Sequence, residues 1–320
     1  MATIARNHHF LSQGYLSSFT DTGTRTGHLF VLDLISRKLF STSPRNVGAQ
    51  RDFNRIESDT YAPDALEQGL SDLEGKTIAV IRKIIDSGEL PPDQELSYVM
   101  NLISLLVVRN PRSRRTMNAA RGQTIRIIGD MLTSNKQLFE HHFAKAKEDG
   151  FVSDDADVSF EAMREFIERG EYTIEIPTAT SLASELSIFD DILKLIGSRH
   201  WSLMIAAADA PDFVTCDHPV SVVFKDRKIR GPIGYGLRAT EVSFPLGPRH
   251  SLLGVFEDPF ERHLEAATEQ VADFNTRIVM HADRQIYSRT DEVIVLQGED
   301  LQRFDVRSNT PLQQPNGADD

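Results

Sequence analysis

The chain has 320 residues, of which 40% are hydrophobic and 26% charged, and its formal net charge is −12. These are ordinary globular values, in a chain long enough to bury a core without disulfides or a structural metal. The acidic balance repels polyanions and anionic lipid, so we expect neither a nucleic-acid partner nor a membrane partner. The single cysteine, Cys216, excludes an internal disulfide and fits a reducing compartment, which predicts a cytoplasmic location.

The first region, residues 1–57, combines a short motif with a hairpin. Apolar side chains in residues 7–20 fall on one stripe and predict a short helix. The segments 28–33 and 38–42 read as strands separated by a tight turn, which predicts a small β-hairpin.

Residues 58–200 are predicted to be helical, because apolar side chains recur there at three- and four-residue steps. Gly88 ends the first helix, and Asp93 is expected to cap the second, which is apolar almost all round near its end. Pro111 starts the third helix, since proline suits a first helical turn. Later helices are predicted at about 135–147, 158–169 and 180–198, with an acidic loop at 149–157.

From Trp201 the pattern changes to short apolar runs that favour strands. Strands are predicted at 202–207, 213–216, 221–224, 241–244, 251–256 and 285–287, with a helix at 261–281. The expected fold class is α+β, with a small N-terminal helix and hairpin, a central helical bundle, and a C-terminal antiparallel β region with one long helix. We expect one globular domain over residues 1–302, its β-rich part at 201–302, followed by a polar, disordered tail at 303–320.

Several spaced motifs carry a resemblance to a known family. They are Asn7–Phe19, Asn46–Phe53, Phe213–Val220, Phe244–His250, Phe274–Arg277 and Ala282–Ser288. In this order they resemble the family catalogued as domain of unknown function 4238 (DUF4238), over about residues 7–290. The resemblance implies a fold and a set of positions to watch, and it implies no established reaction.

Titratable residues in these motifs are the catalytic candidates. His8 and His9 could act as a general base or bind a metal, whereas the alternative is one histidine bonded to backbone and one at the surface. Asp217 and His218 stand just before Pro219, which holds them extended at a strand end, where an aspartate also commonly caps a turn. Cys216 is expected to be dispensable.

The motifs also supply the candidate substrate-binding residues, which are Tyr15, Arg51, Asn275 and Arg284. For Arg51 the alternative is a structural ion pair that ties the hairpin to the helical body. A dense basic stretch, which we interpret as a solvated helix face rather than a phosphate-binding surface, contains Arg109, Arg112, Arg114, Arg115, Arg121 and Arg126. No metal ligand is assigned, and the cofactor is left open.

Two functions stay open from the sequence. The first is a hydrolase acting on a phosphate or acyl bond, in which histidine is the base and aspartate orients it. The second is a non-enzymatic binding or regulatory module. In both, the partner is a small molecule or a protein, and the amino-terminal motif is predicted to pack against the carboxyl-terminal β region.

Overall fold

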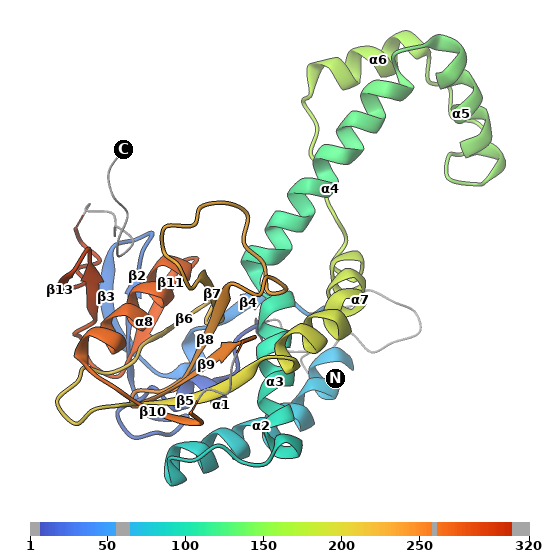
Figure 1. Cartoon of the computed structure of the whole chain (residues 1–320). Helices are drawn as coiled ribbons and strands as arrows, with labels where there is room; N and C mark the ends of the chain where they lie inside the picture. Colours follow the sequence, from blue (N-terminus) through green and yellow to red (C-terminus); the bar gives the residue numbers. More distant parts are fainter. Residues whose placement is uncertain (1–6, 56–64, 258–260, 309–320) are drawn as a thin grey trace. The chain divides into compact units, whose positions relative to one another are not determined.

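The structure is a computed structural model that describes residues 7–55, 65–257 and 261–308. Its mixture of helices and largely antiparallel sheets confirms the predicted α+β class (Figure 1). The chain forms two compact units, residues 1–112 with 182–320 and residues 113–181. The second unit lies within residues 58–200, which the sequence assigned to one helical bundle. The single domain over residues 1–302 stays a prediction.

A five-stranded sheet lies at the centre of the first unit, in the order β10-β5-β9-β8-β7. Strand β10 runs parallel to β5, and the other neighbours are antiparallel. The strands are β5 (His200–Ala206), β7 (Ser221–Phe224), β8 (Thr240–Gly247), β9 (His250–Val255) and β10 (His263–Ala266). Strand β7 therefore forms one edge of this sheet.

A second, four-stranded antiparallel sheet joins the two ends of the chain in the order β3-β2-β11-β6. The predicted hairpin is confirmed as β2 (Leu29–Asp33) and β3 (Lys38–Thr42). Its inner strand pairs with β11 (Gln285–Ser288), which also pairs with the two-residue strand β6 (Thr215–Cys216).

The helices α2 (Ala65–Ser87) and α3 (Asp93–Val108) pack against each other and against the five-stranded sheet. Helix α3 is buried on every side from Leu102 to its end, as its apolar sequence there predicts. The long helix α8 (Thr268–His281) packs on β12 (Ile294–Gln297), and β13 (Asp300–Arg303) completes that hairpin.

Backbone hydrogen bonds to residues 48–51 anchor the amino-terminal motif, and Gly48 contributes to them. Strand β1 (Asn7–His9) pairs with β4 (Ala49–Arg51), and the 3-10 turn η1 (Pro44–Asn46) precedes β4. The carbonyl of Gly48 accepts hydrogen bonds from the next two amides, Phe10 N (3.0 Å) and Leu11 N (3.1 Å). Gly48 has φ +64°, and an added Cβ would lie 3.1 Å from Leu11 Cβ, so glycine suits this position for two reasons.

Tyr15, on the short helix α1 (Gln13–Ser17), joins this motif to the carboxyl-terminal strands. Its fully buried hydroxyl lies 2.7 Å from Thr215 Oγ1 and donates to Pro245 O at 2.8 Å. Its ring stacks on Phe244 with centroids 5.2 Å apart. The predicted packing of the amino-terminal motif on the carboxyl-terminal β region is confirmed.

The second unit is helical and contains most of α4 (Pro111–Leu132), all of α5 (Lys136–Glu148) and α6 (Phe160–Arg169), and the start of α7 (Thr178–Gly197). Phe139, Phe143 and Phe160 form one aromatic cluster in it, and Phe166 stacks on Tyr172. The acidic segment 149–157 connects α5 to α6 without regular structure, as predicted.

Several sequence predictions are wrong in detail. Residues 7–9 form a strand rather than a helix because they pair with β4, and residues 263–266 form β10 because they pair with β5. The first residue of α3 is Asp93, and its cap is Pro92. Arg303 lies in β13 and Val306 is buried, so the disorder predicted from residue 303 is wrong for these residues. The rest of that prediction, at 309–320, and the helix opening predicted at 58–64 lie outside the described residues.

We predict that Tyr15→Phe lowers the free energy of unfolding by about 1–3 kcal/mol, because Pro245 O and Thr215 Oγ1 lose a buried partner. Tyr98→Phe is the matched control, since its half-buried ring contacts Lys76 rather than a buried polar network. Urea denaturation of both variants measures the difference. Equal stability of Tyr15→Phe and the unmodified protein would contradict the anchoring role.

Candidate functional site

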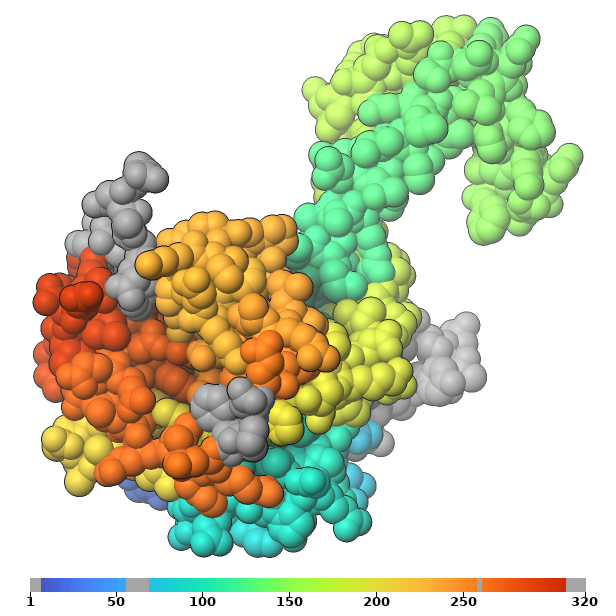
Figure 2. Space-filling view, in the orientation of Figure 1, coloured from blue at the N-terminus to red at the C-terminus, as the bar shows by residue number. Residues whose placement is uncertain are grey.

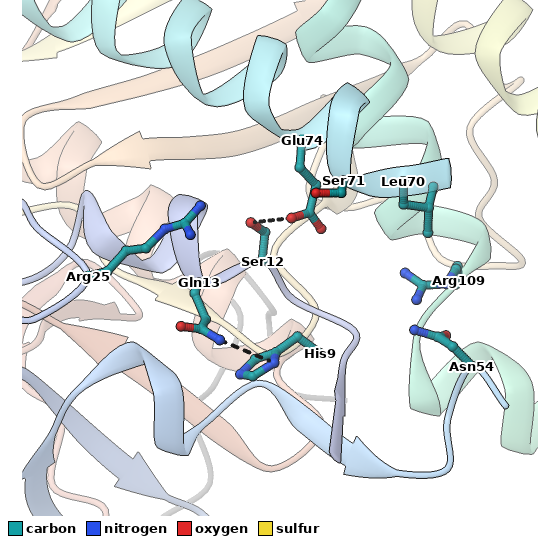
Figure 3. A pocket seen from close by; sticks show the side chains of 9 residues that line it. All are labelled: His9, Ser12, Gln13, Arg25, Asn54, Leu70, Ser71, Glu74 and Arg109. Carbon is teal, nitrogen blue, oxygen red and sulfur yellow. Dashed lines mark hydrogen bonds between the residues drawn. The ribbon is translucent and has the colours of Figure 1, made fainter. Parts of the chain in front are cut away.

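A polar cavity of about 170 Å³ opens beside the amino-terminal motif (Figure 3). Strand β1, the start of α1, the loop before β2, the segment after β4, and helices α2 and α3 all contribute to its wall. It is lined by His9, Ser12, Gln13, Arg25, Asn54, Leu70, Ser71, Glu74 and Arg109. Segments far apart in the sequence thus meet around one small volume.

The two adjacent histidines have different surroundings because strand side chains alternate between faces. His8 is 2% exposed, and its Nδ1 accepts a hydrogen bond from Asn54 N at 2.9 Å. His9 lines the cavity, with its Nδ1 3.5 Å from Gln13 Nε2. His8 therefore holds the segment after β4 in place, while His9 faces the cavity.

Ser12 connects the start of α1 to helix α2. Its hydroxyl caps α1 by accepting from Gly14 N at 3.1 Å, and it donates to Glu74 Oε2 at 3.2 Å. Figure 3 shows this contact between the loop and the helix. The Ser12 proton is directed at a carboxylate, so Ser12 fixes the position of Glu74 on the cavity wall.

Two guanidinium groups reach the cavity from opposite sides (Figure 3). Arg25 is exposed, whereas Arg109 is 5% exposed and packs over the Phe53 ring with 5.5 Å between Cζ and the centroid. Among the described lining residues Glu74 is the carboxylate, so two guanidinium groups face one carboxylate there. The predicted solvated face is wrong for Arg109, which is buried at the end of α3.

Asp217 lies in a different hydrogen-bond network. Its carboxylate accepts from three successive backbone amides, Asp283 N (2.9 Å), Arg284 N (2.8 Å) and Gln285 N (3.0 Å). Burial raises the pKa of Asp217 to about 6, although these amides oppose the rise. Asp217 thereby fixes the turn that leads into β11, and it is not among the residues that line the cavity.

His218 stacks on His281, with ring centroids 4.4 Å apart and planes inclined by 9°. Burial lowers the pKa of His218 to about 4 and that of His281 to about 3, and the charge of Arg112 lowers both further. Arg112 Nη1 also donates to His281 O at 3.0 Å. Both imidazoles are therefore neutral near pH 7.

The lone thiol, Cys216, is fully buried beside this pair. Burial and the nearby charge of Asp217 raise the pKa of Cys216 well above its usual range. Its sulfur accepts from His218 N at 3.3 Å. A thiol in this state is a poor nucleophile, which agrees with the expectation that Cys216 is dispensable.

The four predicted substrate-binding residues lie outside the cavity wall. Tyr15 belongs to the core, and the fully buried Asn275 bonds through its side chain to Val214 N, Asp212 O and Ile294 O. The side chain of Arg51 is 70% exposed and lies 3.4 Å from that of the adjacent Asp52, so this ion pair does not tie the hairpin to the helical body. Arg284 Nε donates to Asp33 Oδ2 at 2.8 Å. Burial would raise the pKa of Asp33, but hydrogen bonds from Ser36 N, the Gln285 side chain and Arg284 lower it to about 2.

The chain matches the family model described as "Protein of unknown function (DUF4238)" over residues 7–292. It belongs to this family. The match spans both the amino-terminal motif and the strands on which Tyr15 is anchored, so the DUF4238 model covers the cavity and its frame. No curated protein and no solved structure matches the chain.

Metal-binding clusters and membrane-spanning helices are both absent from the described part of this DUF4238 protein. The described residues contain no group of three or more His, Cys, Asp and Glu side chains placed to hold a metal ion. Across the same ranges, no helix combines the length and apolar character needed to cross a membrane.

Sequence reasoning missed most of the cavity wall. Ser12 and Gln13 belong to the motif Asn7–Phe19, and this membership could have identified them as candidates. Glu74 and Arg25 carry no such signal, because the first is one of many polar positions on α2 and the second lies in an ordinary polar loop. Their relation to His9 appears only when the chain is folded.

We predict that the free energy of unfolding falls as the pH drops from 6.5 toward 4, because both stacked histidines have folded pKa values below the ordinary 6.5. Each ring should contribute a loss of about 2 kcal/mol between pH 7 and pH 5. Asp217 acts in the opposite direction, since its raised pKa favours the folded state as the pH falls from 6 to 4.

Variants distinguish the contribution of the two histidines to the pH dependence of stability from that of Asp217. His281→Phe keeps an aromatic ring and removes one titrating group, so its stability should decline less between pH 7 and pH 5. His141→Phe, at an exposed helical position, is the control and should decline like the unmodified protein. Parallel pH profiles for His281→Phe and the unmodified protein would refute the assigned cause.

Proposed function

We propose that the cavity beside His9 is the functional site, that it binds a small anionic ligand, and that the protein hydrolyses a phosphate or acyl bond in that ligand. The observation that carries the proposal is the meeting of His9 with two guanidinium groups on the wall of one small cavity. The non-enzymatic binding module is the alternative, and it shares the binding step.

The charges on the wall support an anionic ligand. The whole chain is acidic, yet within the part of the wall that the structure describes Arg25 and Arg109 stand against one carboxylate, Glu74. A guanidinium presents several donors in a plane, which suits phosphate and carboxylate oxygens. The amides of Gln13 and Asn54 add neutral hydrogen-bonding groups.

The size of the cavity supports a small ligand or the head of a larger one. Its volume of about 170 Å³ lies below the range of roughly 300–1,000 Å³ that is typical of sites for drug-sized molecules. A phosphoryl or carboxylate group with a short substituent fits such a volume. A long polymer would have to lie largely outside it.

His9 supports the chemical step. When the Gln13 amide donates to Nδ1, that nitrogen carries the lone pair, and the 3.5 Å separation is long for a hydrogen bond. A water molecule or a ligand hydroxyl can take the place of Gln13 and give its proton to Nδ1. The two arginines would stabilise the negative charge that develops during attack on a phosphate or acyl group.

Binding is tested with inorganic phosphate by isothermal titration calorimetry. We expect Arg25→Ala to weaken binding about tenfold or more, equivalent to about 1.4 kcal/mol, because Arg25 supplies charge at the rim without belonging to the core. Arg45→Ala removes an exposed arginine elsewhere and should bind phosphate normally. Equal affinity for all three proteins would remove the cavity as the anion site.

The chemical step is tested with p-nitrophenyl phosphate and p-nitrophenyl acetate. We expect His9→Gln to keep phosphate binding and to lower the turnover rate about a hundredfold, the usual scale for loss of a general base. Cys216→Ser serves as the control and should keep its rate, since the thiol is buried away from the cavity wall. Phosphate binding without hydrolysis of either ester by the unmodified protein would favour the binding module.

A further inference from the structure

The loop between β7 and β8 has a charge opposite to that of the chain. Residues 225–238 contain one acidic residue, Asp226, and five basic ones, whereas the whole protein carries −12. The five are Lys225, Arg227, Lys228, Arg230 and Arg238. Most of this segment lies at the surface, within the yellow-to-orange part of the molecule in Figure 2.

A second cavity, of about 180 Å³, lies between this loop and strand β7. The strand contributes three successive residues, Val222, Val223 and Phe224, and the loop contributes Arg230 and Ile233 among others. Successive side chains of a strand point to opposite faces. A cavity that touches all three therefore runs along the edge of the sheet rather than over one face.

The backbone pattern shows which groups face that edge. Lys225 N donates to Ala239 O at 2.9 Å. Hydrogen-bonded pairs alternate with non-hydrogen-bonded pairs along an antiparallel ladder, so the pairs Val223–Glu241 and Ser221–Ser243 are also hydrogen-bonded. The amides and carbonyls of Val222 and Phe224 then point away from β8. Strand β7 ends the sheet, so no strand among the described residues pairs with them on that side.

The same alternation accounts for the contact of Tyr235. Val220 lies two residues before Val222, so its backbone groups also point away from β8. Its carbonyl accepts a hydrogen bond from the Tyr235 hydroxyl at 3.1 Å. The loop thus covers the start of the edge with a side chain. The stretch beside the cavity is left for a backbone partner.

Several cations of the loop are available to that partner. Arg227 is engaged by Asp273 at 3.3 Å and by Glu241 at 3.9 Å. In contrast, Lys228, Arg230 and Arg238 are exposed and form no ion pair with any residue in the described ranges. Apolar side chains stand among them, with Ile229 40% and Ile233 42% exposed.

We propose that this edge binds an extended acidic peptide of a partner protein, which adds to the sheet as a strand beside β7. The peptide backbone pairs with Val222 and Phe224, its carboxylates contact Lys228 and Arg230, and an apolar side chain enters the cavity. An anionic lipid surface would meet the same cations, but it has no backbone donors and acceptors to satisfy a sheet edge. The edge therefore favours the peptide.

The test uses a displayed library of random peptides with the full chain as bait. Enriched peptides should alternate apolar residues with Asp or Glu, and Arg230→Glu should weaken their binding about tenfold or more by placing like charges together. Arg45→Glu introduces the same charge change at an exposed site elsewhere and should bind normally. Circular dichroism confirms that both variants are folded.

Amide exchange measured by NMR with one enriched peptide checks the geometry. Val222 and Phe224 should gain protection, while Val223, which already bonds to β8, should change little. The proposal is overturned if no acidic peptide is enriched, if Arg230→Glu binds as tightly as the unmodified protein, or if these two amides stay unprotected. Binding to phosphatidylserine vesicles that Arg230→Glu abolishes, without binding to peptides, would assign the loop to lipid.

Discussion

The packing of the first unit depends on the buried hydroxyl of Tyr15. Tyr15 lies in a fully buried position, where a phenol without hydrogen-bond partners would be costly, and it is satisfied by Thr215 and Pro245, 200 and 230 residues later. The strands that provide those partners belong to the four- and five-stranded sheets, respectively. One side chain of the amino-terminal motif thus fixes both sheets relative to the wall of the candidate site.

Most of the motif residues serve the frame rather than the cavity. Asp217 holds a turn through three amides, Asn275 joins three separate segments, and Gly48 allows the close approach of Leu11. Polar residues in these places are needed because buried backbone groups require partners. His9, Ser12 and Gln13 are the motif residues that face the cavity, so the amino-terminal motif combines both roles.

The accuracy of the sequence predictions follows from how local each signal is. Strand β7 was predicted at its observed limits because its apolar run is bounded by Pro219 and a charged loop. Helix α3 was predicted because its apolar positions repeat over four turns, although its cap was placed one residue too late. Strands β1 and β10 were misread since their conformation is set by pairing with β4 and β5. The cavity could not be predicted, because Glu74 and Arg109 come from helices whose sequences indicate only which side packs on the core.

The separation between Tyr15 and Pro245 also has a consequence for biosynthesis. A ribosome adds roughly 5–20 residues each second, so the partner of the Tyr15 hydroxyl emerges roughly 10–50 s after Tyr15 itself. During that interval Leu11, Leu16 and Phe19, all fully buried in the finished protein, have no carboxyl-terminal sheet to cover them. The nascent amino-terminal segment is therefore a natural client for chaperones until the last third of the chain has been made.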